Sequence, residues 1–265
     1  MSEPSTSESS TSESSNSEVS SFVSHLIELK DRLTRALLAL LIVFGCLFYW
    51  ARDIYTLLAA PLLAELPVGT QLIAVEVAAP FFVPVKVTMF AAFVIGLPYI
   101  LYQVWAFVAP GLYTHEKKLV VPLIATSTLL FLVGMAFAYF VVFPVVFRFI
   151  TAFAPEGVAV MTDIQKYFDF VLTLFLAFGV AFETPIAVVI LTRFGIVSVE
   201  KLKEIRPYVV VGAFVTAAIF TPPDVVSQLL LAFPLWILYE IGLLVSSWMA
   251  KTEDDEQTQS DSSQS

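Results

Sequence analysis

Apolar residues fill long uninterrupted stretches of the chain, and charged residues fall mainly between these stretches. A helix needs about 20 apolar residues to cross the hydrocarbon core of a bilayer. Four stretches meet this requirement, at residues 33–51, 87–108, 119–143 and 168–191. The pattern therefore predicts an all-α integral membrane protein whose first four transmembrane helices occupy these residues.

Two shorter apolar stretches follow, at residues 207–220 and 225–245, with Thr-Pro-Pro-Asp between them at 221–224. This tetrapeptide predicts a tight turn and hence a helical hairpin. The first arm offers only about 13 uninterrupted apolar residues, or about 20 Å of helix against a hydrocarbon core of about 30 Å. We expect six transmembrane helices with short fifth and sixth spans, around which the bilayer thins. A re-entrant hairpin that does not cross the membrane is the alternative.

Basic residues predict the orientation, because Lys and Arg near span ends are retained in the cytoplasm. With six spans, ten of the 14 Lys and Arg fall on one side of the membrane and four on the other. The ten are Lys30, Arg32, Arg35, Lys117, Lys118, Arg193, Lys201, Lys203, Arg206 and Lys251. This imbalance predicts that both termini are cytoplasmic, and a re-entrant hairpin would leave the parity unchanged.

The two ends of the chain differ in composition from its body. Residues 1–20 are mostly Ser, Thr and Glu with no basic stretch, which predicts a disordered tail rather than a cleavable signal. Residues 249–265 predict a second, acidic tail, so the six-helix membrane domain takes residues 21–248. The tails hold nine of the 23 acidic residues, and the other fourteen equal the Lys and Arg in number. The net charge of −9 therefore describes the tails and does not indicate a nucleic-acid partner.

Two loops on the predicted outer side, residues 52–86 and 144–167, are rich in Pro and apolar residues. Such sequences predict interfacial helices that lie over the membrane surface. We expect them to form a packing cap rather than a ligand site. Pro61 lies in the first of these loops.

The sequence lacks the motifs of a nucleotide-driven pump or a hydrolase. It has no GxxxxGK[ST] loop, no HExxH, no GxSxG and no cluster of cysteines. Cys46 has no partner for a disulfide, and His25 and His115 are the only histidines. We therefore expect no enzymatic activity, no cofactor and no metal site.

Two carboxylates, Glu28 and Glu116, lie next to predicted spans on the same side of the membrane. Glu28 belongs to an amphipathic segment, 24–33, where it could simply solvate the helix that Ser24 begins. Glu116 ends a Pro- and Gly-containing loop, where it could cap the third span. Capping explains one carboxylate but not two at one membrane face. Each of the two could also take a guanidinium through paired N–H bonds, a geometry that Arg offers and Lys does not.

Glu183 lies well inside the fourth predicted span. A charge at the bilayer centre costs at least about 2.5 kcal/mol on insertion scales. Glu183 must therefore face a polar partner or a water-filled cavity, or be protonated, and membrane carboxylates of this kind are functional by default. Pro185 follows closely, and we expect it to kink the helix and free a backbone carbonyl.

Five sequence blocks occur in the order and spacing of one known family. They are SHxxEL at 24–29, YQVWAFVAPGLYxxEKK at 102–118, FGxxFETP at 178–185, RPY at 206–208 and TPPD at 221–224. Together they resemble the TatC family, the multi-span core subunits of twin-arginine protein translocases. The resemblance covers roughly residues 21–248 and leaves only the tails outside it.

The resemblance implies a six-helix, glove-shaped protein of the bacterial cytoplasmic (inner) membrane. Such a protein receives the twin-arginine signal peptide of folded cargo and joins single-span TatA-like and TatB-like subunits in a multimeric complex, energised by the proton-motive force. By position, Glu28 and Glu116 match the family's signal-peptide site, together with Phe107 and His25. The two arginines would pair with the two carboxylates, and the apolar part of the signal would enter a groove toward Glu183.

Further positions match the family's membrane and partner contacts. Glu183 matches the polar residue of the concave membrane face, and Pro61 falls in the outer loop. Asp224 and Gln228 fall at the last hairpin, which the family uses in translocation and partner contact. One departure concerns Lys30, where the family often has Arg. Lys keeps the positive charge but loses the bidentate geometry, so we assign it no specific bond.

A second function class is a proton-coupled small-solute transporter with Glu183 as its coupling site. Transporters usually show repeated halves with paired broken helices. The sequence shows no such repeat between residues 30–143 and 145–248, which favours the translocase receptor. Within that hypothesis, a proton role for Glu183 and a polar contact to TatA or TatB explain its presence equally well.

Overall fold

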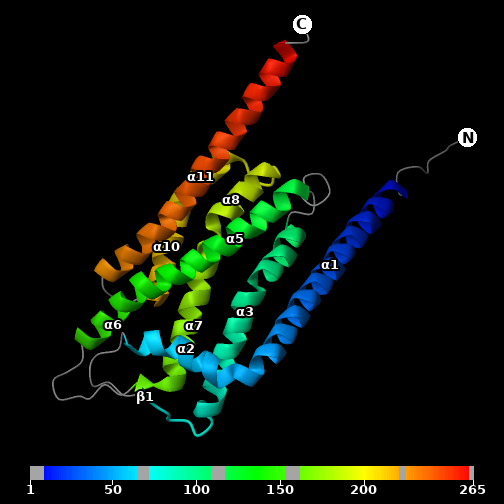
Figure 1. Ribbon diagram of the computed structural model, residues 1–265. Helices are drawn as coiled ribbons and strands as arrows, with labels where there is room; N and C mark the ends of the chain where they lie inside the picture. Colours follow the sequence, from blue (N-terminus) through cyan, green and yellow to red (C-terminus); the bar gives the residue numbers. More distant parts are fainter. Residues whose placement is uncertain (1–8, 65–71, 109–116, 153–161, 221–224, 263–265) are drawn as a thin grey trace, which may run out of the picture.

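A computed structural model describes residues 9–64, 72–108, 117–152, 162–220 and 225–262, and these residues are almost entirely helical (Figure 1). The all-α fold class is confirmed. The helices are α1 (Ser9–Leu47), η1 (Phe48–Trp50), α2 (Ala51–Ala64), α3 (Ala79–Val108), α5 (Lys117–Phe137), η2 (Ala138–Val142), α6 (Phe143–Ala152), α7 (Ile164–Ala181), α8 (Thr184–Arg193), α9 (Val199–Glu204), α10 (Arg206–Phe220) and α11 (Val225–Ser262). Two short strands, β1 (Leu72–Ile73) and β2 (Thr162–Asp163), pair in parallel.

Five helical stretches in the described residues are long and apolar enough to cross a membrane. They are Leu26–Ala59, Ala79–Val108, Val120–Phe147, Ile164–Arg193 and Leu231–Met249. A shorter apolar helix, Arg206–Ile219, corresponds to the predicted short fifth span. The beginning of α1 and the end of α11 lie at the same end of the molecule (Figure 1), which agrees with an even number of crossings.

The hairpin of α10 and α11 is joined by polar contacts near both of its ends. Arg206 at the start of α10 pairs with Glu240 of α11, with 2.8 Å between the guanidinium nitrogen and the carboxylate oxygen. Toward the turn, the Gln228 side-chain amide of α11 donates a hydrogen bond to the Phe214 carbonyl of α10, at 3.2 Å. Gln228 thus forms a hydrogen bond between the two helices of the hairpin.

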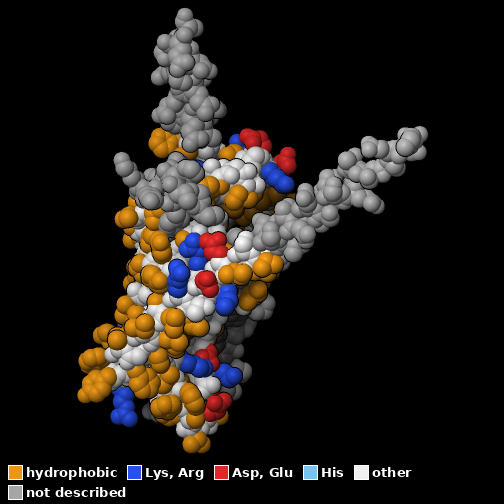
Figure 2. Space-filling view, turned by 90° about the vertical axis from the view of Figure 1, so that its right-hand side faces the viewer, with side chains coloured by type: hydrophobic (Ala, Val, Ile, Leu, Met, Phe, Trp, Pro, Cys, Tyr) orange, Lys and Arg blue, Asp and Glu red, His pale blue; other side chains and the backbone are white. Residues whose placement is uncertain are grey.

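The helix α1 differs from the others because it packs along one side of the molecule, mainly against α3 (Figure 1). None of the residues in the most apolar part of its candidate span, Leu26–Ala59, is buried. In the corresponding parts of the other four candidate spans, 33% to 44% of the residues are buried. Figure 2 shows the hydrophobic side chains that cover much of this side of the protein, with charged side chains gathered in separate groups. Both α1 and α11 continue into the polar ends of the chain. The parts of α1 and α11 that fall in the predicted tails are polar, and an isolated polar helix is only marginally stable in water. The disorder of these tails therefore stays a prediction.

Two glycines bring α5 and α7 unusually close together. A Cβ on Gly134 would lie 2.5 Å from the Phe178 carbonyl oxygen, and one on Gly179 would lie 2.5 Å from the Phe131 ring. Small residues at such crossings allow helix backbones to approach in a membrane. This close crossing sets the position of the segment that follows α7, which contains Glu183.

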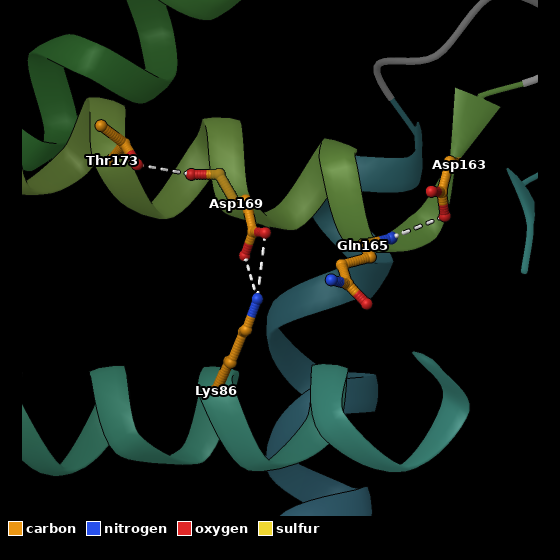
Figure 3. A network of polar contacts seen from close by, with 5 residues as sticks. All are labelled: Lys86, Asp163, Gln165, Asp169 and Thr173. Atoms are coloured by element: carbon orange, nitrogen blue, oxygen red, sulfur yellow. Dashed lines mark hydrogen bonds and ion pairs between the residues drawn. The ribbon is translucent and has the colours of Figure 1, made fainter. Parts of the chain in front are cut away.

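The end of the molecule opposite the termini carries α2, which falls in the first predicted loop, and α6, which continues α5 through η2 (Figure 1). The short strands β1 and β2 connect the two loops that were predicted to lie on the outer side. An ion pair joins α3 to α7 nearby: the Lys86 ammonium lies 2.7 Å and 3.0 Å from the two carboxylate oxygens of Asp169 (Figure 3). Asp163 accepts a hydrogen bond from the backbone N–H of Gln165 and so caps α7. These contacts fix the end of α7 that lies opposite the termini.

Candidate functional site

The fourth span is broken at Glu183. The helix α7 ends at Ala181, and α8 begins at Thr184 with Pro185 in its first turn. Because Pro185 has no N–H, it cannot bond the Ala181 carbonyl four residues earlier. The Thr184 hydroxyl donates to this carbonyl instead, at 2.6 Å. The predicted kink and freed carbonyl at Pro185 are therefore present, as a break in the helix, and the Glu183 side chain contacts Ser127 of α5.

The Glu183 carboxylate is held by a chain of hydrogen bonds from two other helices. The Ser127 hydroxyl of α5 donates to Glu183 Oε2 at 2.8 Å. The Trp105 indole N–H of α3 donates to the Ser127 oxygen, also at 2.8 Å. Ser127 is fully buried and Trp105 is 6% exposed. Glu183 thus has the polar partner that a membrane carboxylate requires.

The second oxygen of this carboxylate, Oε1, is buried and has no hydrogen-bond donor among the described residues. The same is true of the side-chain oxygen of Gln103, which lies on α3 close in sequence to Trp105. An unsatisfied buried acceptor costs about 1–3 kcal/mol. Glu183 therefore presents one fixed oxygen and one oxygen able to accept a further donor or a proton.

Ser127 and Trp105 were not predicted from the sequence. A buried indole N–H usually finds an acceptor, so the presence of Trp105 in an apolar helix indicates that some hydrogen-bond acceptor lies nearby. That signal does not reveal the acceptor, because the register between α3, α5 and α7 depends on packing. The glycine crossing of α5 and α7 supplies this register.

The other candidate carboxylate, Glu28, lies on α1 and is 38% exposed. The Arg32 guanidinium, one turn later, donates through two of its nitrogens to Glu28 Oε1, at 2.9 Å and 2.7 Å. The spacing of four residues places both side chains on one face of the helix. Glu28 is thus geometrically able to take a guanidinium through two N–H groups.

The structure describes the remaining candidate residues unequally. Phe107 lies in the last turn of α3 and is partly buried. Glu116 and Asp224 lie outside the described residues, as do the side chains of His25 and Pro61. The end of α3 and the start of α5, which flank Glu116 in sequence, lie at the end of the molecule that carries the termini (Figure 1). The pairing of Glu116 with Glu28 stays a prediction.

Comparison with known proteins gives a consistent result. The family model "Sec-independent protein translocase protein (TatC)" matches residues 24–234. The TatC proteins of Escherichia coli (strain K12) and Azotobacter chroococcum mcd 1 are 55% and 54% identical to the chain. These alignments cover 84% and 88% of this chain, and 87% and 91% of the relatives.

The fold also matches a solved structure. The "Crystal Structure of Twin Arginine Translocase Receptor- TatC" superposes with a TM-score of 0.71 at 40% sequence identity. The match covers 84% of this chain and 98% of the solved one. The similarity therefore extends over nearly the whole fold of that receptor.

Proposed function

Because this chain belongs to the TatC family of Sec-independent protein translocase proteins, we propose that it is the receptor and core subunit of a twin-arginine translocase. Members of this family are translocase components and not enzymes. In the proposed role the protein binds the twin-arginine signal peptides of folded proteins and passes their cargo across the membrane. The relative described as a twin-arginine translocase receptor supports this role.

The observation that carries the proposal is the arrangement of Glu28 and Arg32. One carboxylate oxygen of Glu28 already accepts two N–H groups from a guanidinium at a partly exposed position. A signal-peptide arginine presents the same group and would exchange with Arg32 or add to the other oxygen. Charge-assisted bidentate pairs of this kind discriminate Arg from Lys by geometry. Glu116 would take the second arginine, and Phe107 and His25 would line the site.

The proposed location is the bacterial cytoplasmic (inner) membrane, with both termini in the cytoplasm. The multi-pass architecture and the bacterial relatives support this location. The excess of basic residues at the termini end supports the orientation, since Lys and Arg are retained inside. Glu28 then faces the compartment in which signal peptides are made.

The proposed partners are single-span TatA-like and TatB-like subunits, assembled with this chain in a multimeric complex. Glu183 offers a buried oxygen, and a polar side chain from a partner helix would satisfy it. The last hairpin, with Gln228 and Asp224, would provide a further contact for these helices. The proton-motive force would energise transport, and Glu183 is able to hold a proton at the same oxygen.

The proposal is tested by crosslinking a signal peptide to photoreactive probes at positions 24 and 115, which lie near Glu28 and Glu116 in sequence and leave both carboxylates in place. A peptide with its Arg-Arg pair should crosslink strongly at both positions. A Lys-Lys peptide should crosslink at least about tenfold less, because Lys keeps the charge but loses the paired N–H geometry, and a loss of about 1.4 kcal/mol already weakens binding tenfold. A probe at position 52, at the opposite end of the molecule, serves as the control and should stay unlabelled. Equal crosslinking of the two peptides would refute the receptor proposal.

A further inference from the structure

The short helix α8, which follows the break at Glu183, lies against α11 in a close crossing (Figure 1). A Cβ on Gly242 of α11 would lie 3.0 Å from the Cα of Pro185 and 3.0 Å from the Cβ of Val188. It would also lie 3.2 Å from the Pro185 carbonyl oxygen. At these distances a side chain at position 242 would push the two helices apart. The close approach of their backbones therefore depends on glycine at this position.

Polar contacts extend this crossing along α11. The Thr192 hydroxyl of α8 donates a hydrogen bond to the hydroxyl of Ser246, at 3.0 Å, and Ser246 is 3% exposed. Gly242 and Ser246 are thus two small residues, four positions apart, that both meet α8, a spacing that lets membrane helices approach closely. The Tyr239 hydroxyl of α11 also donates to the Leu202 carbonyl of α9, at 2.7 Å. The helix α11 therefore holds both α8 and α9.

The packing of α8 toward α5 is looser. An apolar cavity of about 550 Å³ lies between α5, α8 and α11, and Leu123 of α5 and Ile186 of α8 are among its lining residues. The helix α8 also reaches α3 and α5 through Ile186 and Ile190, which belong to one buried apolar cluster with Trp105. Side chains that border a cavity lose packing contacts on that side. The tightest contact of α8 is therefore the one with α11.

Glu183 lies between two close helix crossings. The crossing of α5 and α7 precedes it in the chain, and the crossing of α8 and α11 at Pro185 and Gly242 follows it. The Glu183 backbone is tied to α8, because its carbonyl accepts a hydrogen bond from the Ala187 N–H at 2.9 Å. A displacement of α8 away from α11 would therefore move the Glu183 carboxylate relative to Ser127, its hydrogen-bond donor on α5.

We propose that Gly242 is a positioning residue for the Glu183 carboxylate, and that α11 sets the place of this carboxylate through α8. Gly242 acts through the Pro185 backbone: it fixes how closely α8 approaches α11, and so where the two oxygens of Glu183 lie. Because α11 is also one arm of the last hairpin, a partner helix that shifts α11 would move the carboxylate. A consequence for transport rests on the proposed translocase function, whereas the positioning itself is a property of the fold.

Trp105 allows a direct test, because its indole N–H ends the chain of hydrogen bonds that begins at Glu183. The indole N–H signals of the isotope-labelled, full-length protein are recorded by NMR in detergent micelles, and the loss of one signal in Trp105→Phe assigns it. We expect Gly242→Val to shift the Trp105 signal, and Gly242→Ala to shift it less. Gly45→Val on α1 is the matched control and should leave the signal in place, since a Cβ there meets nothing within 4 Å.

A double variant distinguishes the two routes by which α8 could affect Trp105. In a Ser127→Ala background the link from Glu183 is already removed, so adding Gly242→Val should cause no further shift. An equal shift in that background would show that the displacement reaches Trp105 through apolar packing, and would overturn the proposal. An unmoved Trp105 signal would also overturn it. Thermal unfolding checks that each variant is folded, and Gly242→Ala decides the question if Gly242→Val is not.

Export of a folded reporter connects this position to transport. Export by Gly242→Val should fall by about two- to thirtyfold, the range for mutations in a packed network that couples two sites. Gly45→Val should export like the parent, and full export by a Gly242→Val protein with a shifted Trp105 signal would contradict the role in transport. Signal-peptide crosslinking at position 24 should persist in Gly242→Val. The receptor proposal is tested by that crosslinking in the parent protein, so the two proposals fail independently.

Discussion

Glu28 and Glu183 are the same kind of side chain in two different surroundings. Glu28 is partly exposed on α1, and its partner Arg32 comes from the same helix. Glu183 lies inside a span, where Ser127 and Trp105 from two other helices hold one of its oxygens. The first contact can be exchanged at little cost, because exposed ion pairs contribute only about 0–1 kcal/mol. The second depends on the packing of three spans, so it positions a carboxylate rather than offering it to a soluble ligand.

Glu183→Gln separates these two roles most strongly. We expect export of a folded reporter to fall by about tenfold or more, because a neutral amide cannot hold a charge or exchange a proton at this position. Signal-peptide crosslinking at position 24, beside Glu28, should persist in the variant. The measurement is reporter flux in cells that contain equal amounts of each protein. Full export would exclude an obligatory charge or proton role for Glu183.

Gly134→Val tests whether the close crossing of α5 and α7 positions the intramembrane carboxylate. The new side chain would collide with the Phe178 backbone, and we expect a loss of about 1–3 kcal/mol in stability or more. Thermal unfolding in detergent measures this loss. Gly212→Val on α10 is the control, since a Cβ there meets nothing within 4 Å. If the two variants unfold at the same temperature, the close crossing of α5 and α7 does not position the carboxylate in the way proposed.

Ser127→Ala removes the link between Trp105 and Glu183 without adding bulk. Both partners then lose a buried hydrogen bond, which costs about 1–3 kcal/mol. Thermal unfolding should show this loss, and Thr128→Ala on the same helix should show less, since its hydroxyl donates to the backbone carbonyl of Ile124 in its own helix. An unchanged unfolding temperature in Ser127→Ala would mean that the chain of hydrogen bonds contributes nothing.

Arg32→Gln gives the smallest effect and acts only on the exposed carboxylate. It removes the guanidinium that competes for Glu28 within the protein. We therefore expect an Arg-Arg signal peptide to bind about twofold more tightly, because an ion pair between residues four apart on a helix contributes about 0.3–0.5 kcal/mol. Arg35→Gln is the matched control on α1. Fluorescence titration with a labelled peptide measures both variants. Weaker binding in Arg32→Gln alone would show that Arg32 assists the peptide rather than competing with it.

The sequence was sufficient for the features that depend on local composition. The approximate positions of the long apolar helices, the short α10 and the kink at Pro185 follow from hydrophobicity and from the chemistry of proline, and the structure has all three. The Glu28–Arg32 pair was also accessible through its spacing of four residues, although it was not predicted.

The contacts that depend on packing between helices were not accessible in this way. Ser127 is one of several hydroxyl residues in α5, and only the crossing with α7 selects it as the partner of Glu183. Lys86 was assigned to the outer side from the sequence, but its partner Asp169 lies 83 positions away, on α7. Such pairs depend on helix rotation and register, which a one-dimensional pattern does not define.

The most direct test of the central claim is a double-mutant cycle between Glu28→Gln and an Arg→Lys change in the signal peptide. Binding of each peptide to each protein is measured by titration. We predict a coupling of about 1–3 kcal/mol, because either change alone already removes the paired guanidinium bonds and the second change then has little left to remove. Additive effects of the two changes, with no coupling, would contradict the assignment of Glu28 as an arginine receptor.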